Sequence, residues 1–441
     1  MFVGCGAAAL FGCSLSVDAE QARVCRTALP ALNASSTRIV VERAQPGPGE
    51  HSVRVDYAVD AEGGPAVRRW ALCRFAAEGL SLRKAELVGI TTERGPLSGS
   101  SVYLLRRFYI DTPEGIVGDP GPGDQAAGLA EAPPALAYLL QQMLVGLPRT
   151  AIYGLLAAAY ALVFGLVGRI NLAFGELAAV GAAAAVSGVA LASGLNLHTP
   201  VAGLGIGLAC ALFAGAMHSA VGGHFTIARI DSRSAQPSLI ATVGLSLFLM
   251  EYLRLAQSPV TVWIPPLWSD AVPLVRAGSF VVGVTPVSLL TTALGALAAA
   301  AVLLLLHRSG FGLNWRAYAD DPKAARLCGV DGPRLLTRTL AISGALAALA
   351  GTLVVVQYGG LGFAGGFGLG LKALIAAVLG GIGSVAGALL GGLAIGTFET
   401  LWSAYFPIEM RDVALYASLI AVLVFRPGGL VGTRDARPRE V

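Results

Sequence analysis

Long apolar runs are the feature that most limits what this chain can fold into. A membrane-spanning helix needs about 20 predominantly apolar residues, and runs approaching this length recur from residue 152 to residue 425. Charged residues make up only 13% of the chain, whereas an ordinary soluble protein has roughly 25%. The runs occupy residues 152–167, 177–195, 201–221, 239–250, 281–306, 340–356, 373–398 and 413–425.

These runs predict a mainly α-helical fold, a polytopic transmembrane helix bundle of about eight or nine spans. The number depends on residues 380–387, whose glycines allow a hinge within the run 373–398. Charged residues are frequent from Asp18 to Glu131 and scarce afterwards, which places a small soluble α+β domain before the bundle. The predicted segments are a signal or lipoprotein-like segment (1–17), the soluble domain (18–113), a Gly/Pro-rich linker (114–135), the transmembrane domain (136–426) and a cytoplasmic tail (427–441).

The first residues are interpreted as an export segment. Residues 2–15 are apolar, and Leu10-Phe11-Gly12-Cys13 resembles a bacterial lipoprotein box, although Phe11 fits its position poorly. The segment lacks the basic start that a signal peptide has. A buried apolar strand or helix is the alternative interpretation.

The soluble domain shows both helix and strand patterns. Asp18 is placed to cap a helix that runs through Ala28, and residues 53–59 alternate between apolar and polar, as in a half-buried strand. Cys25 and Cys73 would form a disulfide if the domain is exported. Two free cysteines are the alternative.

The basic residues of the apolar part gather in three places. They lie in residues 224–233, in residues 307–338 and in the C-terminal tail. Cytoplasmic loops of membrane proteins carry an excess of Lys and Arg, so all three are predicted to be cytoplasmic and the N-terminal domain to lie on the opposite side. The net charge of +4 comes with basic residues that lie in loops between apolar runs. Because a nucleic-acid surface would gather them on one soluble fold, this distribution argues against nucleic acid as a partner. We expect the apolar runs to be surrounded by membrane lipid.

Motifs for ATP hydrolysis, ester or peptide hydrolysis and metal binding are missing from the sequence. None of the three lysines follows a glycine, so the chain has no Walker A phosphate loop, and it has no HExxH or GxSxG motif. We therefore predict no catalytic residues, no metal site and no cofactor. If ATP drives this protein, another subunit must hydrolyse it.

Small residues recur at helical spacing in two apolar runs. Gly383, Gly387 and Gly391 fall four apart, and so do small residues at 203, 207, 211 and 215. Such faces let helix backbones approach closely in lipid. We predict that these glycines pack helices together.

Residues 316–330 form the most informative polar stretch. Asp320 or Asp321 is placed to cap a short helix, Pro322 suits its first turn and Gly329 can end it. Its small apolar face is formed by Ala324, Ala325 and Leu327. A short helix with such a face between two spans suggests a docking element, and an ordinary solvated loop is the alternative.

Six motifs follow one another through the transmembrane domain. They are Leu140-Gln141-Gln142 with Gly146 and Tyr160-Ala161-Leu162; Gly168-Arg-Ile-Asn171-Leu-Ala-Phe-Gly175-Glu176; and residues 239–246, 320–329, 371–384 and 425–430. Their order and spacing resemble those of the branched-chain amino acid ABC transporter permeases of the LivH type. The second motif is similar to that family's Asn-Phe-Ala-His-Gly-Glu signature. The resemblance extends over residues 139–432, essentially the whole transmembrane domain.

The resemblance implies a permease subunit of the bacterial inner membrane, and the distribution of basic residues then places its N-terminal domain in the periplasm. Such a subunit pairs with a second related permease, two cytoplasmic ATPase subunits and an extracytoplasmic solute-binding protein. Residues 319–329 would then form the coupling helix, which closure of the ATPase dimer moves to switch the bundle between its two states. The candidate coupling residues are Ala319, Asp320, Asp321, Ala324, Ala325, Arg326 and Gly329.

Within this family resemblance, polar residues flanked by apolar sequence become functional candidates. Asn171 and Glu176 would line the solute path or brace a broken helix, and Lys372 and Glu399 would form a buried pair. Interfacial or purely structural pairing is the alternative for all four. The candidate set for the solute path or helix break is Asn171, Phe174, Gly175, Glu176, Thr242, Lys372 and Glu399.

The predicted function is that of a permease subunit of an ABC importer for a branched-chain or other hydrophobic amino acid. Leu172 and Phe174 stand where the family usually has Phe and His, so the path is more apolar than in typical members. Typical members also lack so large an N-terminal domain. The alternatives are an importer for urea, short amides or small carboxylates, a stand-alone secondary transporter, and a sensor or adhesion module on a membrane anchor.

Overall fold

The chain folds into two compact units in the computed structural model. One contains the N-terminal domain together with residues 268–283, and the other contains the long apolar helices. The described residues are 17–33, 38–60, 66–77, 83–110, 119–121, 129–197, 199–227, 236–257, 263–264, 267–268, 271–277, 280–426 and 428–431. The predicted export segment therefore lies outside the described residues except for Val17, as do most of the linker and most of the C-terminal tail.

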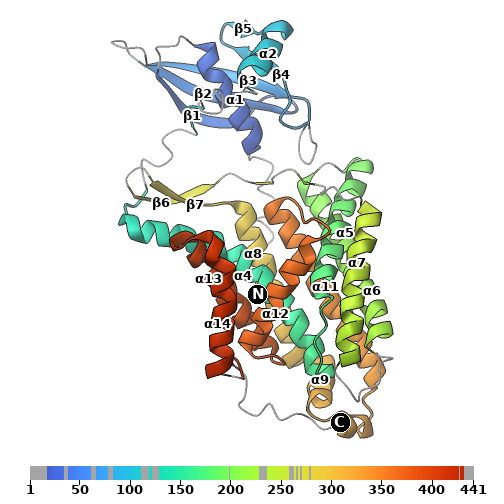
Figure 1. Cartoon of the computed structure of the whole chain (residues 1–441). Coiled ribbons are helices and arrows are strands. Elements are labelled where there is room, and N and C mark those ends of the chain that lie inside the picture. Colours follow the sequence, from blue (N-terminus) through green and yellow to red (C-terminus); the bar gives the residue numbers. More distant parts are fainter. Residues whose placement is uncertain are drawn as a thin grey trace, which may run out of the picture. The chain divides into compact units, whose positions relative to one another are not determined.

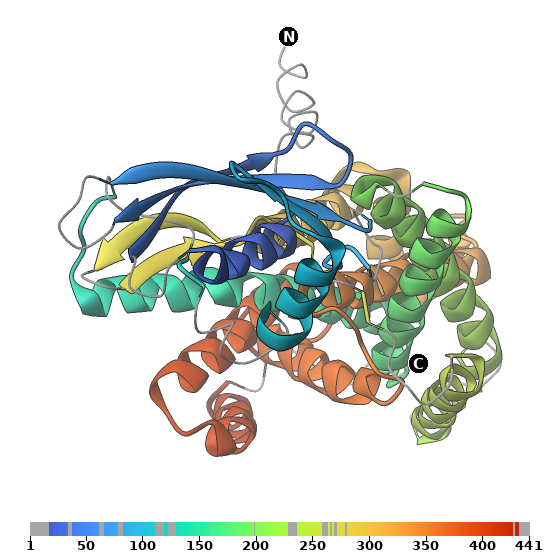
Figure 2. The same ribbon diagram turned by 90° about the horizontal axis from the view of Figure 1, so that it is seen from above.

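The N-terminal domain is an antiparallel sheet with a helix across one face, as Figures 1 and 2 show. Its five strands lie in chain order, so each pairs with the next one along the sequence. The predicted small α+β fold is confirmed. The elements are α1 (Ala19–Leu32), β1 (Arg38–Pro46), β2 (Ser52–Asp60), β3 (Val67–Phe75), β4 (Leu87–Thr92), β5 (Gly95–Pro96), α2 (Gly99–Leu105) and the π-helical turn η2 (Arg106–Ile110).

Local sequence explains the helix and the sheet core of this domain. The Asp18 side chain accepts a hydrogen bond from the Glu20 backbone N–H at 2.9 Å, which is the expected N-cap, and the helix continues to Leu32, four residues beyond the predicted Ala28. Every second residue of β2 from Val53 to Val59 is buried. The buried face of the sheet and that of α1 form one apolar core.

A short hairpin precedes the helix α8 (Pro286–Arg308). Its strands are β6 (Val272–Ala277) and β7 (Phe280–Val284), so the apolar run 281–306 is only partly helical. The reason is Pro286, which lacks the N–H that a helix interior needs and therefore starts the helix. The Thr285 side chain caps it by accepting from the Ser288 N–H.

The second unit is a bundle of membrane-type helices. Among the described residues, seven helices are long and apolar enough to cross a membrane, and α12 is a shorter apolar helix. The predicted helical bundle is thereby confirmed. The remaining elements are α4 (Pro134–Val167), α5 (Phe174–Gly194), α6 (Pro200–Thr226), α7 (Gln236–Gln257), α9 (Gly310–Asp320), α10 (Pro322–Leu327), α11 (Gly332–Tyr358), α12 (Gly365–Gly380), α13 (Val385–Tyr405), the 3₁₀ turn η3 (Ile408–Met410) and α14 (Arg411–Phe425).

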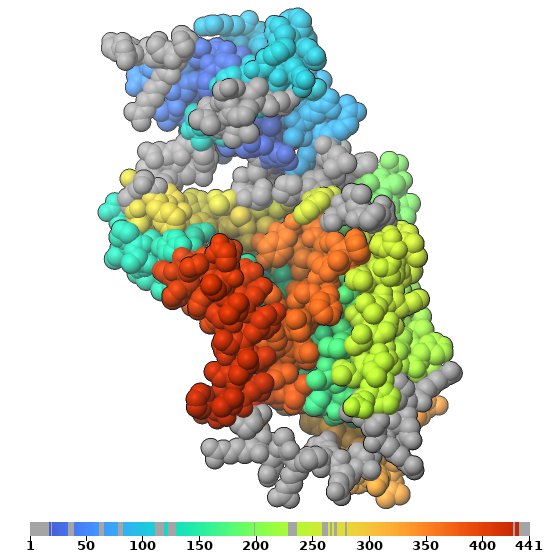
Figure 3. Space-filling model, in the orientation of Figure 1, coloured from blue at the N-terminus to red at the C-terminus, as the bar shows by residue number. Residues whose placement is uncertain are grey.

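The helices of the bundle divide into an inner and an outer set. Most of the apolar stretch of α4, α5 and α11 is buried, whereas only 22% of that of α6, α7 and α8 is buried. Figure 3 shows α7 in yellow-green and α14 in red at the surface of the bundle. Large apolar side chains such as Phe213, Ile240 and Leu255 point outward with at least 70% of their surface exposed. In a membrane these faces meet lipid, which requires no polar surface.

The apolar run 373–398 forms two helices. α12 ends at Gly380, and Gly381 and Gly383 both have positive φ, at 109° and 100°. Ser384 then caps α13 by accepting from the Gly387 N–H at 3.1 Å. The glycine-rich stretch at 380–387 is therefore a turn between two helices and not a hinge within one span.

Candidate functional site

Two pairs of successive helices in the bundle core are each joined by a short non-helical stretch, here called an interruption. α4 ends at Gly168 with φ 70°, and α11 ends at Gly359 with φ 88°, the left-handed glycine that commonly closes a helix. The stretches that follow, 168–173 and 359–364, have six residues each before α5 and α12 begin. The first interruption falls on the predicted helix break, whereas sequence analysis missed the second despite its glycines.

The helices that follow the two interruptions meet at their first turns. A Cβ atom added to Gly175 in α5 would lie 2.2 Å from the carbonyl oxygen of Gly366 in α12, and one added to Gly370 would lie 2.6 Å from the Gly175 Cα. Real Cβ atoms do not approach backbone this closely. Glycine at these three positions is therefore what lets the two first turns touch.

Glu176 lies at this junction, which we define by Gly175, Glu176, Gly366 and Gly370. Its side chain is 1% exposed, and neither carboxylate oxygen has a hydrogen-bond partner within the described residues. A Cβ atom on Gly366 would lie 2.6 Å from Glu176 Oε2, so the carboxylate reaches the first turn of α12. A buried polar group without a partner is rare enough to require an explanation.

Asn171 and Phe174 shape the first interruption beside the junction. The Asn171 side chain is buried and its Oδ1 accepts from the Ala173 N–H at 3.1 Å, which holds the turn into α5. The Phe174 ring is fully buried and lies edge-on to Tyr160, with ring centroids 5.0 Å apart. The structure therefore brings four of the predicted path residues together. Thr242 is buried in α7, where its hydroxyl donates to the Leu239 carbonyl.

Lys372 and Glu399 belong to a separate charged cluster. Lys372 Nζ lies 2.5 Å from Glu399 Oε1 and 3.2 Å from Asp412 Oδ1, and the Tyr153 hydroxyl donates to Glu399 Oε2 at 2.7 Å. Arg411 completes the cluster, at 3.9 Å from Glu399 and 3.4 Å from Asp412. The cluster joins α4, α12, α13 and α14, and its charges are matched inside the chain. This arrangement favours bracing over solute contact for Lys372 and Glu399.

The glycines of α13 face two neighbouring helices. A Cβ atom on Gly391 would lie 1.9 Å from the Ala376 oxygen of α12, and one on Gly392 would lie 2.3 Å from the Gly154 Cα of α4. Gly387 also approaches α12, at Gly380. Gly383 lies in the turn before α13, so its role is to supply a positive φ and not a packing face.

Substituting Gly391 with alanine is expected to lower the free energy of unfolding by about 1–3 kcal/mol, the usual cost of overpacking. The added methyl group would overlap the α12 backbone. Thermal unfolding of the detergent-purified protein measures the effect. Gly205→Ala is the matched control, because a Cβ atom there meets nothing within 4 Å. Equal melting temperatures for the two variants would contradict this packing.

The predicted coupling stretch forms the end of α9 and the whole of α10. Asp321 is the N-cap, since its Oδ1 accepts from the Lys323 and Ala324 N–H groups at 2.8 and 3.1 Å. These two bonds lower the pKa of the Asp321 carboxyl below its usual value, so the cap stays charged at neutral pH. Gly329 follows the helix with φ 88°. Ala319 and Asp320 belong to α9.

The exposed face of α10 differs from the predicted one. Ala325 is 4% exposed and packs inside the chain, whereas Leu327 is 90% exposed. Arg326 donates to the Tyr318 hydroxyl at 2.8 Å, which ties α10 back to α9. Leu327 is therefore the exposed apolar side chain of α10.

Trp315, which sequence analysis missed, connects α9 to α4. Its indole N–H donates to the Leu162 carbonyl at 3.2 Å, and a Cβ atom on Gly165 would lie 2.5 Å from its ring. Gly165 lies just before the interruption 168–173. Trp315 thereby links α9 to the end of α4.

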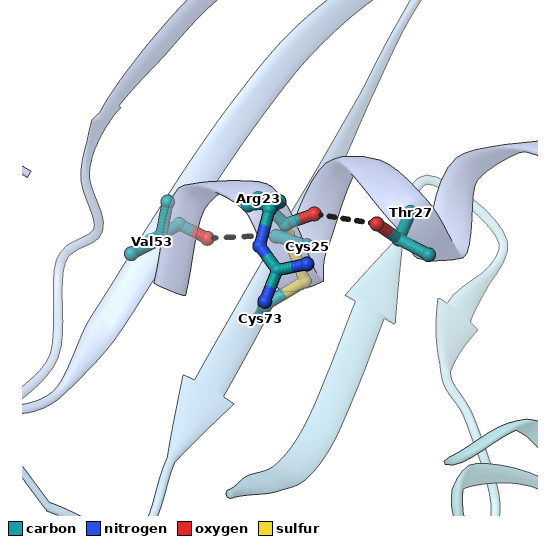
Figure 4. Close-up of a disulfide and its surroundings, with 5 residues drawn as sticks. All are labelled: Arg23, Cys25, Thr27, Val53 and Cys73. Carbon is teal, nitrogen blue, oxygen red and sulfur yellow. Dashed lines mark hydrogen bonds between the residues drawn. A yellow bond between two sulfur atoms is a disulfide. The ribbon is translucent and has the colours of Figure 1, made fainter. Parts of the chain in front are cut away.

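The N-terminal domain holds a disulfide between Cys25 of α1 and Cys73 of β3, as Figure 4 shows. Their Cα atoms are 5.8 Å apart, and both residues are fully buried. Cys210 and Cys328 are free. The disulfide fixes α1 to the centre of the sheet.

The family model that matches this chain covers the membrane unit and does not include the N-terminal domain. The family model described as the permease component of branched-chain amino acid transport systems matches residues 142–423. The chain is 35% identical to the high-affinity branched-chain amino acid transport system permease protein LivH of Escherichia coli K12 over 300 residues, which cover 67% of this chain and 96% of that protein.

Two further relatives have the same kind of name. The chain is 33% identical to the branched-chain amino acid permease protein BraD of Pseudomonas aeruginosa over 313 residues, covering 68% of this chain and 97% of the relative. It is 30% identical to the autoinducer 2 import system permease protein LsrC of Escherichia coli over 199 residues, 43% of this chain and 55% of that protein. The similarity therefore extends to permeases with different solutes.

Proposed function

The chain belongs to the permease family of branched-chain amino acid transport systems, and on that premise we propose that it imports a branched-chain or other hydrophobic amino acid as the membrane subunit of an ABC importer. The observation that carries the proposal is the match over 96% of LivH, a protein named for this transport. The buried, unpartnered Glu176 carboxylate in the bundle core supports it, because ionisable groups inside a membrane bundle mark solute pathways.

Other chains supply the motor and deliver the solute. On this proposal, a second related permease completes the translocation path, two cytoplasmic ATPase subunits hydrolyse ATP, and an extracytoplasmic binding protein hands over the solute. α10 is the element on which an ATPase docks. Its support is the exposed Leu327 on a short capped helix between two spans.

The coupling route runs from α10 to the junction. Docking and closure of the ATPases displace α10, and the Arg326–Tyr318 bond carries α9 with it. Trp315, packed on Gly165, then shifts the end of α4 and with it the interruption that positions Glu176. The junction changes shape in consequence, which alternates access of the solute to the two sides.

Replacing Leu327 with glutamate is expected to lower binding of the ATPase subunit by about 10-fold or more, because a charge would enter an apolar contact. Leu327→Met keeps the volume and apolar character and should bind as the unaltered chain does. Pull-down of the ATPase from detergent extracts, normalised to the permease recovered, measures both. Equal binding of the two variants would remove α10 as the docking element.

The N-terminal domain lies in the periplasm on this proposal. Its support is the Cys25–Cys73 disulfide, since disulfides persist in oxidising compartments, together with the basic residues of α10 and α11, which mark the opposite side as cytoplasmic. A membrane-impermeant maleimide should label Cys25 and Cys73 in intact cells only after external reduction. Labelling without reductant, and only after lysis, would place the domain inside.

The solute itself is tested by uptake. Vesicles containing the assembled importer, with its binding protein outside and ATP inside, should accumulate radiolabelled leucine. Accumulation of urea or of a small carboxylate in place of leucine would favour the other solutes. Uptake that persists without ATP and ATPase subunits would identify a secondary transporter.

A further inference from the structure

The junction contains hydrogen-bonding groups of two opposite kinds that the chain does not pair with each other. One is the Glu176 carboxylate, 1% exposed and without a partner for either oxygen among the described residues. A buried carboxylate in apolar surroundings is costly unless hydrogen-bond donors meet it. The ligand that suits it brings N–H donors and a positive charge.

The other groups are the backbone N–H donors of two helix N-termini. The first N–H groups of a helix have no partner within the helix, and neither α5 nor α12 has a side-chain cap. In α12 the Gly365 N–H donates to the Gly362 carbonyl at 2.9 Å, so the donors meant here are the N–H groups that follow it in the first turn. Both first turns lie at the junction, because Gly175 touches Gly366 and Gly370. Helix N-termini carry a partial positive charge and bind anions. The ligand that suits them is a carboxylate.

We propose that the junction recognises the ammonium and carboxylate groups of a zwitterionic α-amino acid, with Glu176 binding the ammonium and the first turn of α12 binding the carboxylate. The inference rests on the proposed function and names the atoms that would select its solute. An α-amino acid carries its ammonium and carboxylate groups on a single carbon. It therefore matches a junction in which the Glu176 carboxylate lies next to the N-terminus of α12. The apolar surroundings of Phe174 and Tyr160 then accept a hydrophobic side chain.

The same geometry disfavours the other solute classes. A simple carboxylate would add a second negative charge beside Glu176 with nothing to neutralise it, and like charges repel strongly in a buried site. Urea or a short amide would supply N–H donors without a positive charge, so it would gain little from an ionised Glu176. The ion pair that Glu176 can form with an ammonium group is thus the feature that separates an amino acid from an amide.

The junction is closed in this conformation. Gly175 and Gly366 touch through their backbones, so a solute enters between the first turns only when α5 and α12 move apart. The two interruptions allow this, since each leaves six residues outside any helix before the first turn. Binding and release are thereby tied to the movement that the ATPases drive.

The test is Glu176→Gln in the assembled importer, which keeps the size and the acceptor oxygen but removes the charge. Leucine uptake into vesicles should fall by about 10-fold or more, the loss expected for one charged hydrogen bond. ATP hydrolysis stimulated by the leucine-loaded binding protein should stay within about two-fold. Glu251→Gln is the matched control, because Glu251 is exposed on α7 and pairs with Arg254 in the same helix.

Two results would overturn the inference. One is leucine uptake by Glu176→Gln within about two-fold of the unaltered importer. The other is a parallel fall of uptake and ATP hydrolysis, which indicates a structural role. If Glu176→Gln fails to assemble, the test is Glu176→Asp, which keeps the charge and should retain most of the leucine uptake. Loss of leucine uptake in Glu176→Asp would contradict recognition by charge. An unaltered importer that takes up 4-methylpentanoate or urea and no leucine contradicts the proposed function itself.

Discussion

Replacing Glu399 with leucine is expected to lower the free energy of unfolding by about 3–5 kcal/mol, the cost of breaking a buried ion pair from one side. The substitution leaves Lys372 inside the bundle without its 2.5 Å partner and removes the acceptor of the Tyr153 hydroxyl. Arg411 also loses its contact with Glu399. Thermal and denaturant unfolding of the detergent-purified protein measures the loss.

The matched control is the double variant Lys372→Met with Glu399→Leu. Replacing both charges with apolar side chains of similar size is often neutral, and Asp412 and Arg411 still pair with each other at 3.4 Å. The double variant should therefore recover most of the stability that Glu399→Leu loses. A double variant less stable than Glu399→Leu would mean that Lys372 stabilises the bundle through other contacts.

Replacing both Cys25 and Cys73 with serine is expected to destabilise the N-terminal domain by about 4 kcal/mol. The bond closes a loop across a sequence separation of 48, and the chain-entropy relation gives about this value for such a loop. Two hydroxyl groups would also enter a fully buried site. Unfolding of the domain in the full-length protein, followed by limited proteolysis in increasing urea, measures the loss.

Substituting Cys210 and Cys328, the two free cysteines among the described residues, is the control for this experiment. Cys328 is exposed and Cys210 is half-buried in α6, and neither forms a disulfide. Their serine variants should digest as the unaltered domain does. If the variant without Cys25 and Cys73 also digests as the unaltered domain does, the disulfide does not stabilise the domain. It would then no longer support a periplasmic location of the domain.

Sequence periodicity predicted most of the helices but not the connections between them. The apolar runs predicted the helices because length and composition are local properties, and Asp18 and Asp321 were found as caps for the same reason. The turn within the run 373–398 was not predicted, because glycine is common both in transmembrane helices and in turns such as the one at Gly381. The strand β7 was hidden by an apolar composition that suits strand and helix alike.

The candidate site was predicted in part. The family signature drew attention to Asn171 and Glu176, and the structure brings them to one interruption. Tyr153 and Trp315 were missed, because their partners lie 246 and 153 residues away in the sequence. Such contacts leave no local pattern. Ala325 was assigned to the wrong face, since the face of a six-residue helix is set by what packs on it and not by its own periodicity.

Close glycine contacts join the helices of the bundle core in two sets of three, here called bodies, within one compact unit. α13 touches α12 at Gly391 and α4 at Gly392 through backbone atoms, and α11 touches α5 at Gly351 and α6 at Gly344 in the same way. Backbone surfaces in direct contact have no side-chain rotamers to exchange, so these contacts favour a fixed geometry within each set of three helices. Gly175 belongs to the second set and meets the first at α12.

The two six-residue interruptions are the chain's crossings between these bodies. One leads from α4 to α5, out of the first body into the second, and the other leads from α11 to α12, back again. A permease that rocks one body against the other would therefore bend at 168–173 and at 359–364 together. Glu176 follows the first interruption and Gly366 the second, and a Cβ atom on Gly366 would lie 2.6 Å from Glu176 Oε2. Bending at both interruptions would therefore also move the groups that we propose bind the solute.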